Sequence, residues 1–554
     1  MSEVARLVGI AGCGKTTELL RLMEMNIDRG IDPHKIGFVT FTRAARIEAA
    51  ERAASKFGIS KAYLEKQGWF RTIHSVCYKT LNVRGELLTD NAESNAWLED
   101  KLGERISVQR LVDEQNYEAT YDGNSEAAQA LNLWTAARVS LIPLQAMFNK
   151  TWGAKFAYNR PSIEKCFSIV RKYEAAKKED DRMDFTDLLS QFSGVRHTFD
   201  GYEECTPRGN PPPVLVWFHD EAQDASPLSW RVFNRLINHH TVKWSYIVGD
   251  PYQSIFTWCG SDSRCFMNHP AKHERFMLQT YRNHQQVVDT GERMLSQVSG
   301  YGKTRNIIPA PHSGIMSFHE KSFSVTVREK LMHNLNDGWL ILARTNFQAR
   351  GLGRVLDLLG VPWVSNSGGS HWAAPKRNAA FGAIYNLEQN NPISGQDWAV
   401  CLNYLKQRHE GVQMLARGTK ARFKEPHEQD RYDWIQLNDL LEVGATPHLI
   451  EKIRTGAWHD LFSANAREIV TAIEKWGVDV VMSPKVRVST IHSAKGMEEK
   501  NVIYYNALTQ MILDNMDRDS EYKLAYVAAT RAINNLYIVS PQRDEDRGRI
   551  LSLT

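Results

Sequence analysis

The chain has few cysteines, no long apolar run and no N-terminal segment typical of a targeting signal. Its 7 cysteines are odd in number and form no CxxC pair, which argues against a disulfide framework or a cysteine-ligated zinc site and favours reduced thiols. The longest apolar runs have the length of a strand, as in residues 214–218. None reaches the roughly 18 residues that a membrane-spanning helix needs. We therefore expect a cytoplasmic protein without a membrane segment.

An excess of charge of one sign is also lacking. The 554 residues include 68 basic and 64 acidic ones, so the formal net charge is only +4. This balance neither requires nor excludes a polyanionic partner, because basic residues can be concentrated on one surface. With 42 % apolar and 24 % charged residues, the composition is that of a folded protein. The length suggests about three to five domains.

Short apolar runs, each followed by a helical pattern, recur in two parts of the chain. They occupy residues 4–8, 36–41, 214–218, 246–248, 340–343, 486–491, 502–505 and 536–539. Unbroken apolar strands that alternate with helices favour parallel sheets covered on both faces. Residues 85–182 and 388–480 read instead as mostly helical, and we expect one of their helices over 433–443.

The sequence thus predicts an α/β fold with two parallel-sheet domains, each carrying a mainly helical inserted subdomain. The expected boundaries are 1–84 and 183–285 for the first sheet domain, 85–182 for its insertion, 286–387 and 481–554 for the second sheet domain, and 388–480 for its insertion. Ligands of open parallel sheets bind at the carboxyl ends of the strands. We therefore expect the functional residues to follow the apolar runs.

A phosphate-binding pattern directly follows the first apolar run. Residues 9–16 match GxxxxGK[ST] and lie between a strand pattern and a helical one, which is the context that this motif requires. The glycines allow backbone N–H groups to surround phosphates at a helix N-terminus. Lys15 is expected to reach the terminal phosphates, and the Thr16 hydroxyl to bind Mg²⁺. The alternative is an ordinary glycine-rich turn.

An acidic pair follows the apolar run at 214–218. Asp220 and Glu221 lie where phosphate-loop NTPases hold their metal ion. Asp220 is expected to bind Mg²⁺ through water, and Glu221 to act as general base toward the attacking water. Acidic residues after a strand are more often solvated caps, but the phosphate loop upstream favours the catalytic interpretation.

Further segments match the motifs of one family, in the family's order. They are residues 38–45, 71–75, 184–189, 220–224, 248–258, 279–283, 488–498 and 526–532. On these motifs the chain resembles the superfamily 1 helicases of the UvrD/Rep type. The motifs at 248–258, 488–498 and 526–532 are the most specific ones. The resemblance covers somewhat over half of the chain and implies two RecA-like motor domains, whereas the two insertions match by position only.

The resemblance implies an ATP site with Mg²⁺ between the two motor domains. The residues expected to act on the phosphates are Lys15, Asp220, Glu221, Gln253, Arg282 and Arg531. Because Arg531 belongs to the second domain, hydrolysis would require closure of the cleft. The metal would be held by Thr16 and Asp220. The other expected nucleotide contacts are Gly9, Ala11, Gly12, Cys13, Gly14, Thr17, Gly496, Tyr281 on the adenine and Glu498 on the ribose.

One feature of the family is missing from the sequence. Members usually carry a glutamine upstream of the phosphate loop that reads the adenine edge, and none of the residues before Gly9 is a glutamine. We therefore hypothesise that the choice of base is relaxed toward other nucleoside triphosphates.

The resemblance also implies a track for single-stranded DNA across both motor domains. Stacking of bases on aromatic rings contributes about 1–3 kcal/mol per base and tolerates any sequence. The residues expected on this track are Phe41, Thr42, Thr72, His74, Ser75, Phe256, Trp258, Thr490 and His492. Taken singly, Phe41 would more often be a core residue and His492 a structural histidine. Such contacts do not read the sugar strongly, so RNA stays open as a substrate.

We thus expect an ATP-dependent, Mg²⁺-requiring DNA helicase in a bacterial cell or a phage-infected host. It would move on single-stranded DNA, 3′ to 5′ by resemblance, bind junctions of single and double strands, and separate duplexes. One alternative is a DNA-stimulated ATPase subunit that senses or remodels DNA in a larger repair or defence complex without processive unwinding. Another is a non-hydrolysing scaffold, which the intact set Lys15, Glu221, Arg282 and Arg531 disfavours.

The second insertion contains a basic stretch. Its cations are Lys406, Arg408, Arg417, Lys420, Arg422 and Lys424. The stretch is either a solvated loop or a contact to the duplex backbone ahead of the fork. In the second case, neutralising it would weaken duplex binding and flatten the salt dependence of that binding.

Overall fold

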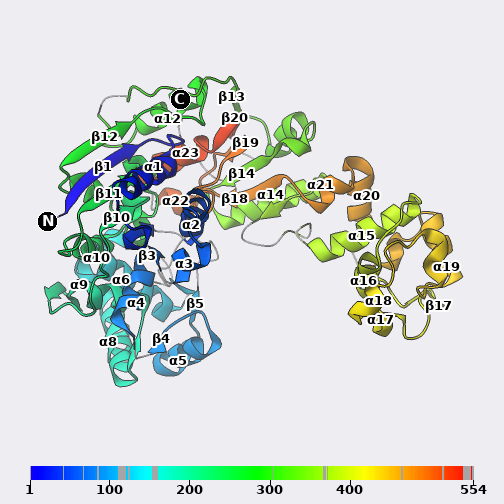
Figure 1. Ribbon diagram of the computed structural model, residues 1–554, viewed down its shortest axis with the longest axis horizontal. Helices are drawn as coiled ribbons and strands as arrows, with labels where there is room; N and C mark the ends of the chain where they lie inside the picture. The colour runs from blue at the N-terminus through cyan, green and yellow to red at the C-terminus, as the bar shows by residue number, and fades with distance from the viewer. Residues whose placement is uncertain are drawn as a thin grey trace.

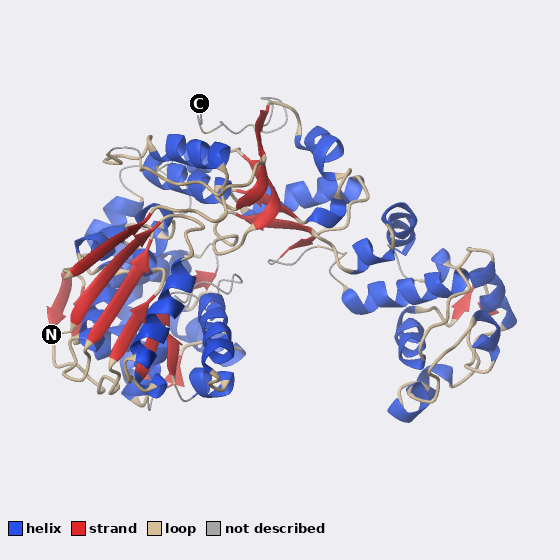
Figure 2. Cartoon of the chain, turned by 45° about the horizontal axis from the view of Figure 1, so that its top comes forward, coloured by secondary structure: helices blue, strands red, loops and turns tan. Residues whose placement is uncertain are grey.

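The structure is a computed structural model that describes residues 2–40, 43–66, 68–83, 86–109, 120–122, 125–152, 160–302, 305–365, 370, 372, 374–462, 466–514, 517–540 and 551. Within these residues, two six-stranded sheets form the frame of the molecule (Figures 1 and 2), and their strands all pair in parallel. This confirms the predicted α/β class with two parallel-sheet domains.

The first sheet has the order β12–β1–β11–β10–β2–β3 and the second the order β13–β20–β19–β14–β18–β15. The strands of the first are β12 (His273–Met277), β1 (Glu3–Gly9), β11 (Trp244–Gly249), β10 (Val216–His219), β2 (Ile36–Thr40) and β3 (Trp69–Thr72). Those of the second are β13 (Ile315–His319), β20 (Ala532–Val539), β19 (Glu499–Tyr505), β14 (Trp339–Ala343), β18 (Val486–Thr490) and β15 (Val364–Ser365).

Helices cover both faces of the first sheet because successive strand residues point to opposite sides. On one side Phe38 and Phe218 pack with residues of α1 (Lys15–Asp28) and α2 (Arg43–Phe57). On the other side Val39 and Trp217 pack with residues of α10 (Pro227–Ile237). The sheet is therefore buried on both faces, and its loops at the carboxyl ends of the strands are held in fixed places.

One apolar cluster joins the two sheet domains. Ile255 and Phe256 from the first domain share it with Tyr526 of α23 (Arg518–Ala529), with residues of α12 (Gln285–Leu295) and with β14. A common core of this kind holds the facing edges of the two domains together.

Two mainly helical parts flank the sheets. The first contains α5 (Ala92–Leu102), α6 (Glu126–Ser140), α7 (Leu144–Thr151) and α8 (Ile163–Glu179). The second contains α15 (Pro375–Glu388), α16 (Gly395–Tyr404), α17 (Thr419–Arg422), α18 (Pro426–Gln429), α19 (Pro447–Arg454), α20 (Ala466–Trp476) and α21 (Val478–Met482). The helices α16 to α19 project away from both sheets (Figure 1).

The remaining helices lie close to the sheets or connect them. They are α3 (Lys61–Lys66), α4 (Ile73–Leu81), α9 (Phe185–Ser193), α11 (Ser263–Asn268), α13 (Phe323–Thr326), α14 (Asn346–Leu358) and α22 (Gln510–Asp514). No helix among the described residues has both the length and the apolar character needed to cross a membrane.

The helical parts differ from the expectation in two details. The prediction of a helix over 433–443 is wrong: the structure has only a short 3₁₀ helix there, Leu437–Leu441. Ile435 instead forms an antiparallel bridge with Ile393, which takes its backbone out of any helix. The parts also contain short strand pairs, namely β4 (Glu86–Leu87) with β7 (Arg182–Met183), β5 (Ser107–Gln109) with β6 (Thr120–Asp122), and β16 (Arg408–His409) with β17 (Val412–Gln413).

Candidate nucleotide site and DNA-facing surface

The loop between β1 and α1 has the geometry of a phosphate cradle. Gly12 and Gly14 have positive φ values of 68° and 77°, which residues with a Cβ rarely adopt. A Cβ at Gly12 would also lie only 2.5 Å from Cβ of Arg282. Lys15 begins α1, and its Nζ lies 3.4 Å from Gly9 O and 3.3 Å from Ile10 O. The ammonium therefore lies within the loop that would surround phosphates.

Asp220 and Glu221 follow β10 at the mouth of this loop. The Thr16 hydroxyl donates to Oδ2 of Asp220 at 3.3 Å. Burial, reinforced by repulsion from Glu221, raises the pKa of Asp220 to about 7. Burial also raises the pKa of Glu221, but the charges of Lys15 and Lys495 outweigh it and hold that pKa below its usual value. The site thus has one ionised carboxylate beside the lysine and one carboxyl that a nearby cation would ionise.

These residues fit a magnesium ion. Thr16 and Asp220 offer a hydroxyl and a carboxylate oxygen at one place, and hard oxygen donors are the ligands that Mg²⁺ prefers. Mg²⁺ usually keeps several waters, so two protein ligands beside a phosphate chain are sufficient.

Arg531 extends from the second sheet domain to this group of residues. Its Nε donates to Val527 O at 2.9 Å and its Nη1 to Met497 O at 3.1 Å. These bonds direct Nη2 toward Oε1 of Gln253 in the first domain, at 3.4 Å. Burial and the nearby Arg282 lower the pKa of Arg531 to about 9. A buried guanidinium next to a second one is a favourable place for an anion.

Arg282 and its neighbours lie on the other side of the phosphate loop. The backbone N–H of Tyr281 donates to Gly12 O at 2.9 Å, and the Tyr281 side chain is 71 % exposed. Arg282 donates to Thr530 O at 3.2 Å and forms an ion pair with Glu498. The expected adenine and ribose contacts, Tyr281 and Glu498, are therefore both exposed beside the loop.

The other expected nucleotide contacts lie in or next to the loop. Ala11 and Cys13 are buried in it, and Thr17 is in the first turn of α1. Gly496, between Lys495 and Glu498, is exposed and has a positive φ of 85°, a conformation that glycine adopts readily.

Two residues of this pocket were not among the expected site residues. Lys495, which follows β18, forms a buried ion pair with Asp224, which follows β10. Lys495 Nζ also donates to Gln253 O at 2.6 Å. One amine of the second domain thus contacts two loops of the first. Both residues lie inside recognised motifs, but only their positions in space reveal the pair.

The described residues of the expected DNA track differ in exposure. Trp258 lies on a short 3₁₀ helix, Thr257–Cys259, and is 51 % exposed. Phe256 is only 2 % exposed; its ring packs 6.0 Å from the His492 ring and 5.1 Å from Lys495 Nζ. Of these two aromatic residues, only Trp258 offers an open face for a base. Phe41 and Thr42 lie outside the described residues.

The expected phosphate contacts lie at the starts of helices or in turns. Thr72 caps α4 by accepting a hydrogen bond from Ser75 N at 3.3 Å, and Ser75 Oγ accepts one from Arg71 at 3.0 Å. His74 is buried, and burial lowers its pKa to about 4. Thr490 and Ser493 are linked at 2.7 Å in the turn after β18, and burial lowers the pKa of His492 to about 3. Both histidines are therefore neutral at physiological pH.

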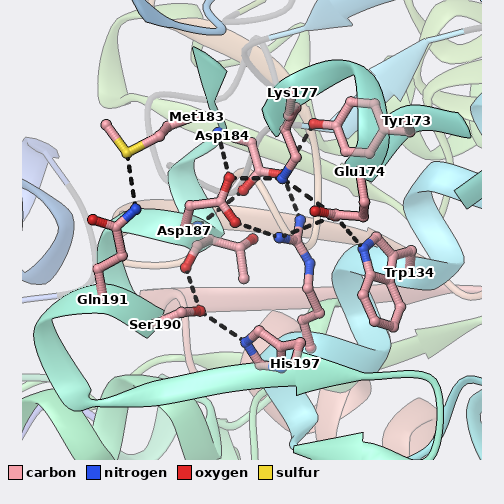
Figure 3. Close-up of polar contacts among 12 residues, drawn as sticks. Trp134, Tyr173, Glu174, Lys177, Met183, Asp184, Asp187, Ser190, Gln191 and His197 are labelled. Atoms are coloured by element: carbon pink, nitrogen blue, oxygen red, sulfur yellow. Dashed lines mark hydrogen bonds and ion pairs between the residues drawn. The ribbon is translucent and has the colours of Figure 1, made fainter. Parts of the chain in front are cut away.

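The segment at 184–189 is anchored to the first helical part by a buried ion network (Figure 3). Asp184 and Asp187 form the capping box of α9. Asp184 Oδ2 accepts from Arg138 of α6 at 2.6 Å and from Lys177 of α8 at 2.9 Å. Tyr173 donates to the same oxygen at 3.0 Å. This segment therefore fixes the helical part to the first sheet domain and lies outside the nucleotide pocket.

One parallel sheet carries a phosphate loop, and an arginine from the other sheet domain lies beside it. This arrangement defines a two-domain phosphate-loop NTPase. Residues 3–274 match the UvrD/REP helicase N-terminal domain, and residues 397–543 match the UvrD-like helicase C-terminal domain. The chain therefore belongs to the UvrD/Rep helicase family.

Two relatives match along nearly the whole chain, and a third along half of it. It is 22 % identical to the putative ATP-dependent DNA helicase YjcD of Bacillus subtilis, over 96 % of this chain and 76 % of that protein. It is also 22 % identical to the ATP-dependent DNA helicase PcrA of Leuconostoc citreum, over 96 % of this chain and 79 % of that protein. A probable DNA helicase II homolog of Mycoplasma capricolum is 26 % identical over 52 % of this chain and 38 % of its own length.

Proposed function

We propose that this protein is an ATP-dependent DNA helicase that hydrolyses ATP in the cleft between its two sheets and moves on single-stranded DNA. The observation that carries the proposal is the meeting in one pocket of Lys15 and Glu221 from the first sheet domain with Arg531 from the second. The names of its relatives in Bacillus and Leuconostoc, both ATP-dependent DNA helicases, support the same conclusion.

The pocket can stabilise phosphoryl transfer with the groups that it already holds. Lys15 would neutralise charge on the terminal phosphates, while Arg531 and Arg282 would contact the γ-phosphate oxygens. Two guanidinium groups suit a transition state whose charge is spread over three oxygens. Glu221, with its lowered pKa, is ionised and can orient and deprotonate the attacking water. Mg²⁺ held by Thr16 and Asp220 would neutralise further phosphate charge when bound.

Hydrolysis would be coupled to movement through the cations of the cleft. Lys15 and Arg282 would attract the triphosphate from one side and Arg531 from the other, because the charge of its phosphates is opposite to theirs. ATP would draw the two domains together, and loss of the γ-phosphate would remove that attraction. Gln253, five positions before Trp258, would transmit the change to the loop that holds a base. Closure and opening of the cleft would then shift the strand between the two domains.

The DNA track in this proposal follows the same cleft. Trp258 would stack on a base, and the half-buried hydroxyl of Ser75 would contact a phosphate. Thr72 and Thr490 are only 3 % and 8 % exposed, so they would instead hold the start of α4 and the turn after β18 in place. Phe256 and His492 would support the Trp258 loop from beneath, and His74 would help to shape α4. We propose movement in the 3′ to 5′ direction, and we propose the domain boundaries 1–84 with 183–285, 85–182, 286–387 with 481–554, and 388–480.

Strand displacement on substrates with opposed single-stranded tails tests the proposal. The expected result is ATP- and Mg²⁺-dependent separation of a duplex that carries a 3′ tail, with little separation of the 5′-tailed duplex. DNA-stimulated ATP hydrolysis without displacement of either duplex would instead favour a subunit that remodels DNA within a larger complex. Absence of DNA-stimulated hydrolysis would overturn the proposal.

A further inference from the structure

Arg305 lies outside every motif of the sequence, in the segment between α12 and β13. Its side chain is only 16 % exposed and is surrounded by three tyrosine rings. The guanidinium carbon lies 5.0 Å from the ring centre of Tyr252, 5.9 Å from that of Tyr301 and 5.5 Å from that of Tyr526. Guanidinium groups are attracted to aromatic faces, and the attraction grows when water is excluded. Arg305 is therefore held as the centre of a small buried cluster.

Two carboxylates complete this cluster. Nε and Nη2 of Arg305 donate to Oε1 of Glu292 at 3.1 and 2.8 Å, and Nη1 lies 3.8 Å from Oδ1 of Asp250. Nη2 also donates to the Tyr526 hydroxyl at 3.3 Å. Burial lowers the pKa of Arg305, but the acidic neighbours outweigh it and raise that pKa well above its ordinary value. The guanidinium therefore stays charged, donates hydrogen bonds to Glu292 and Tyr526, and forms an ion pair with Asp250.

Two partners of Arg305, Tyr526 and Asp250, connect it to the residues of the nucleotide site. The Tyr526 hydroxyl lies 3.5 Å from the backbone N–H of Ala11 in the phosphate loop and donates to Asp250 Oδ2 at 3.3 Å. Asp250 in turn accepts from Nε2 of Gln253 at 2.8 Å. Tyr526 also belongs to α23, which leads directly to Arg531. Through one intervening residue, the Arg305 side chain is thus connected to the phosphate loop, to the Gln253 loop and to the helix that leads to Arg531.

We propose that Arg305 is a positioning residue for ATP turnover. Through the Tyr526 hydroxyl and the Asp250 carboxylate, it fixes the phosphate loop and the Gln253 loop relative to α23. The inference rests on the proposed ATPase function, but it assigns a role to a residue that does not touch the nucleotide. A lysine could keep the charge of Arg305, but its single ammonium cannot direct donors at Glu292, Tyr526 and Asp250 together.

The test combines three variants and one matched control. Arg305→Ala removes the guanidinium and all of its contacts, and Arg305→Lys keeps only the charge. Tyr526→Phe removes only the hydroxyl that contacts the backbone N–H of Ala11. Arg6→Ala is the control: Arg6 is 13 % exposed and pairs with Glu274 at 2.8 Å, but it contacts neither Ala11 nor Asp250 in the described structure. Each variant is assayed for the thermal unfolding midpoint, the affinity for a fluorescent ATP analogue, and the KM and kcat of DNA-stimulated hydrolysis.

Arg305→Ala should raise the KM for ATP and the Kd of the analogue roughly tenfold, because a network of charge-assisted hydrogen bonds is lost. Arg305→Lys should recover part of this loss. Tyr526→Phe should raise the same constants, and its combination with Arg305→Ala should be no worse than Arg305→Ala alone, since the two side chains act in one chain of contacts. Arg6→Ala should lower the unfolding midpoint without raising KM.

Two results would overturn the inference while the wild-type protein hydrolyses ATP. One is a KM and Kd for Arg305→Ala that match those of Arg6→Ala at a similar loss of thermal stability. The other is full additivity of Arg305→Ala and Tyr526→Phe. A wild-type protein that neither binds the analogue nor hydrolyses ATP would contradict the proposed function itself, so the two failures are distinguishable.

Discussion

Arg531 of the second sheet domain contacts Gln253 of the first, with Nη2 of the arginine 3.4 Å from Oε1 of the amide. The same glutamine accepts, through its backbone oxygen, a hydrogen bond of 2.6 Å from Lys495. Gln253 thus lies between two cations of the opposite domain. Since the Asp250 carboxylate also holds its side chain at 2.8 Å, the amide cannot move without disturbing contacts with both domains.

We predict that Arg531→Ala lowers kcat for ATP hydrolysis by about 10³-fold, as the loss of a trans-acting arginine does in phosphoryl transfer. ATP binding should change much less, because Lys15 and the phosphate loop belong to the other domain. Steady-state hydrolysis with single-stranded DNA and equilibrium binding of a fluorescent ATP analogue separate the two effects. Turnover that survives the substitution would show that hydrolysis does not need the second domain.

Glu221→Gln should give a protein that binds ATP and does not turn it over. The amide has nearly the same shape as the carboxylate but cannot accept the proton of the attacking water, so hydrolysis should fall by about 10²–10⁴-fold. In the presence of ATP this variant should hold single-stranded DNA with a slower dissociation rate than the wild type. Glu451→Gln is a suitable control, because Glu451 is an exposed residue of the second helical part that pairs with Arg454. Wild-type turnover by Glu221→Gln would contradict the assignment of the general base.

Trp258→Ala should weaken binding of single-stranded DNA by about 1–3 kcal/mol, the range for loss of one stacked base. The ring is 51 % exposed, so its removal should change the thermal unfolding midpoint little. Trp434→Ala is the matched control, since Trp434 is an exposed tryptophan (72 %) between α18 and α19 and was not expected on the DNA track. Fluorescence anisotropy with a labelled oligonucleotide measures both variants. Equal affinities for the two would remove Trp258 from the DNA track.

The central strands of both sheets could be predicted from the sequence, and the edge strands could not. All eight apolar runs correspond to the four inner strands of each sheet, which are buried on both faces. The four edge strands, β12, β3, β13 and β15, were missed. β12 is almost entirely exposed and reads HERFM, and β13 is half exposed. Edge strands need less apolar character because only one neighbour and part of one face cover them.

The residues of the candidate site also differ in whether the sequence could predict them. The phosphate-loop pattern and the acidic pair after an apolar run indicated Lys15 and Glu221, and the family resemblance implied Gln253 and Arg531. The partner of Lys495 could not be found in this way, since Asp224 is 271 positions away in the sequence. The burial of Phe256 could not be predicted either. The sequence around an aromatic residue in a loop does not show whether its ring faces a base or a neighbouring domain.

The basic stretch of the second insertion gives a prediction about salt dependence. Arg408, Arg417 and Lys424 are exposed, whereas Lys420 is half-buried and donates to Leu405 O at 2.7 Å. If the exposed cations contact a duplex, replacing these three by glutamine should reduce the slope of log K against log salt by up to about 0.9 per lost phosphate contact. Lys420→Gln should leave the slope unchanged. An unaltered slope in the triple variant would identify the stretch as a solvated loop.

His197 gives a prediction about acid stability. Its Nε2 lies 2.8 Å from Ser190 Oγ, and burial, aided by the charge of Arg138, lowers its pKa to about 3. Because this value lies below the ordinary one of about 6.5, the unfolded chain binds the proton more readily than the folded one. The contribution of His197 is thus fully present above pH 6.5 and is lost as the pH falls toward the folded value. When the pH is lowered from 7.5 to 5.5, the free energy of unfolding should fall by about 1 kcal/mol less in His197→Gln than in the wild type. The glutamine can still form a hydrogen bond with Ser190. Thermal unfolding midpoints of both proteins at the two pH values measure the difference, and equal shifts would mean that folding does not lower the pKa of His197.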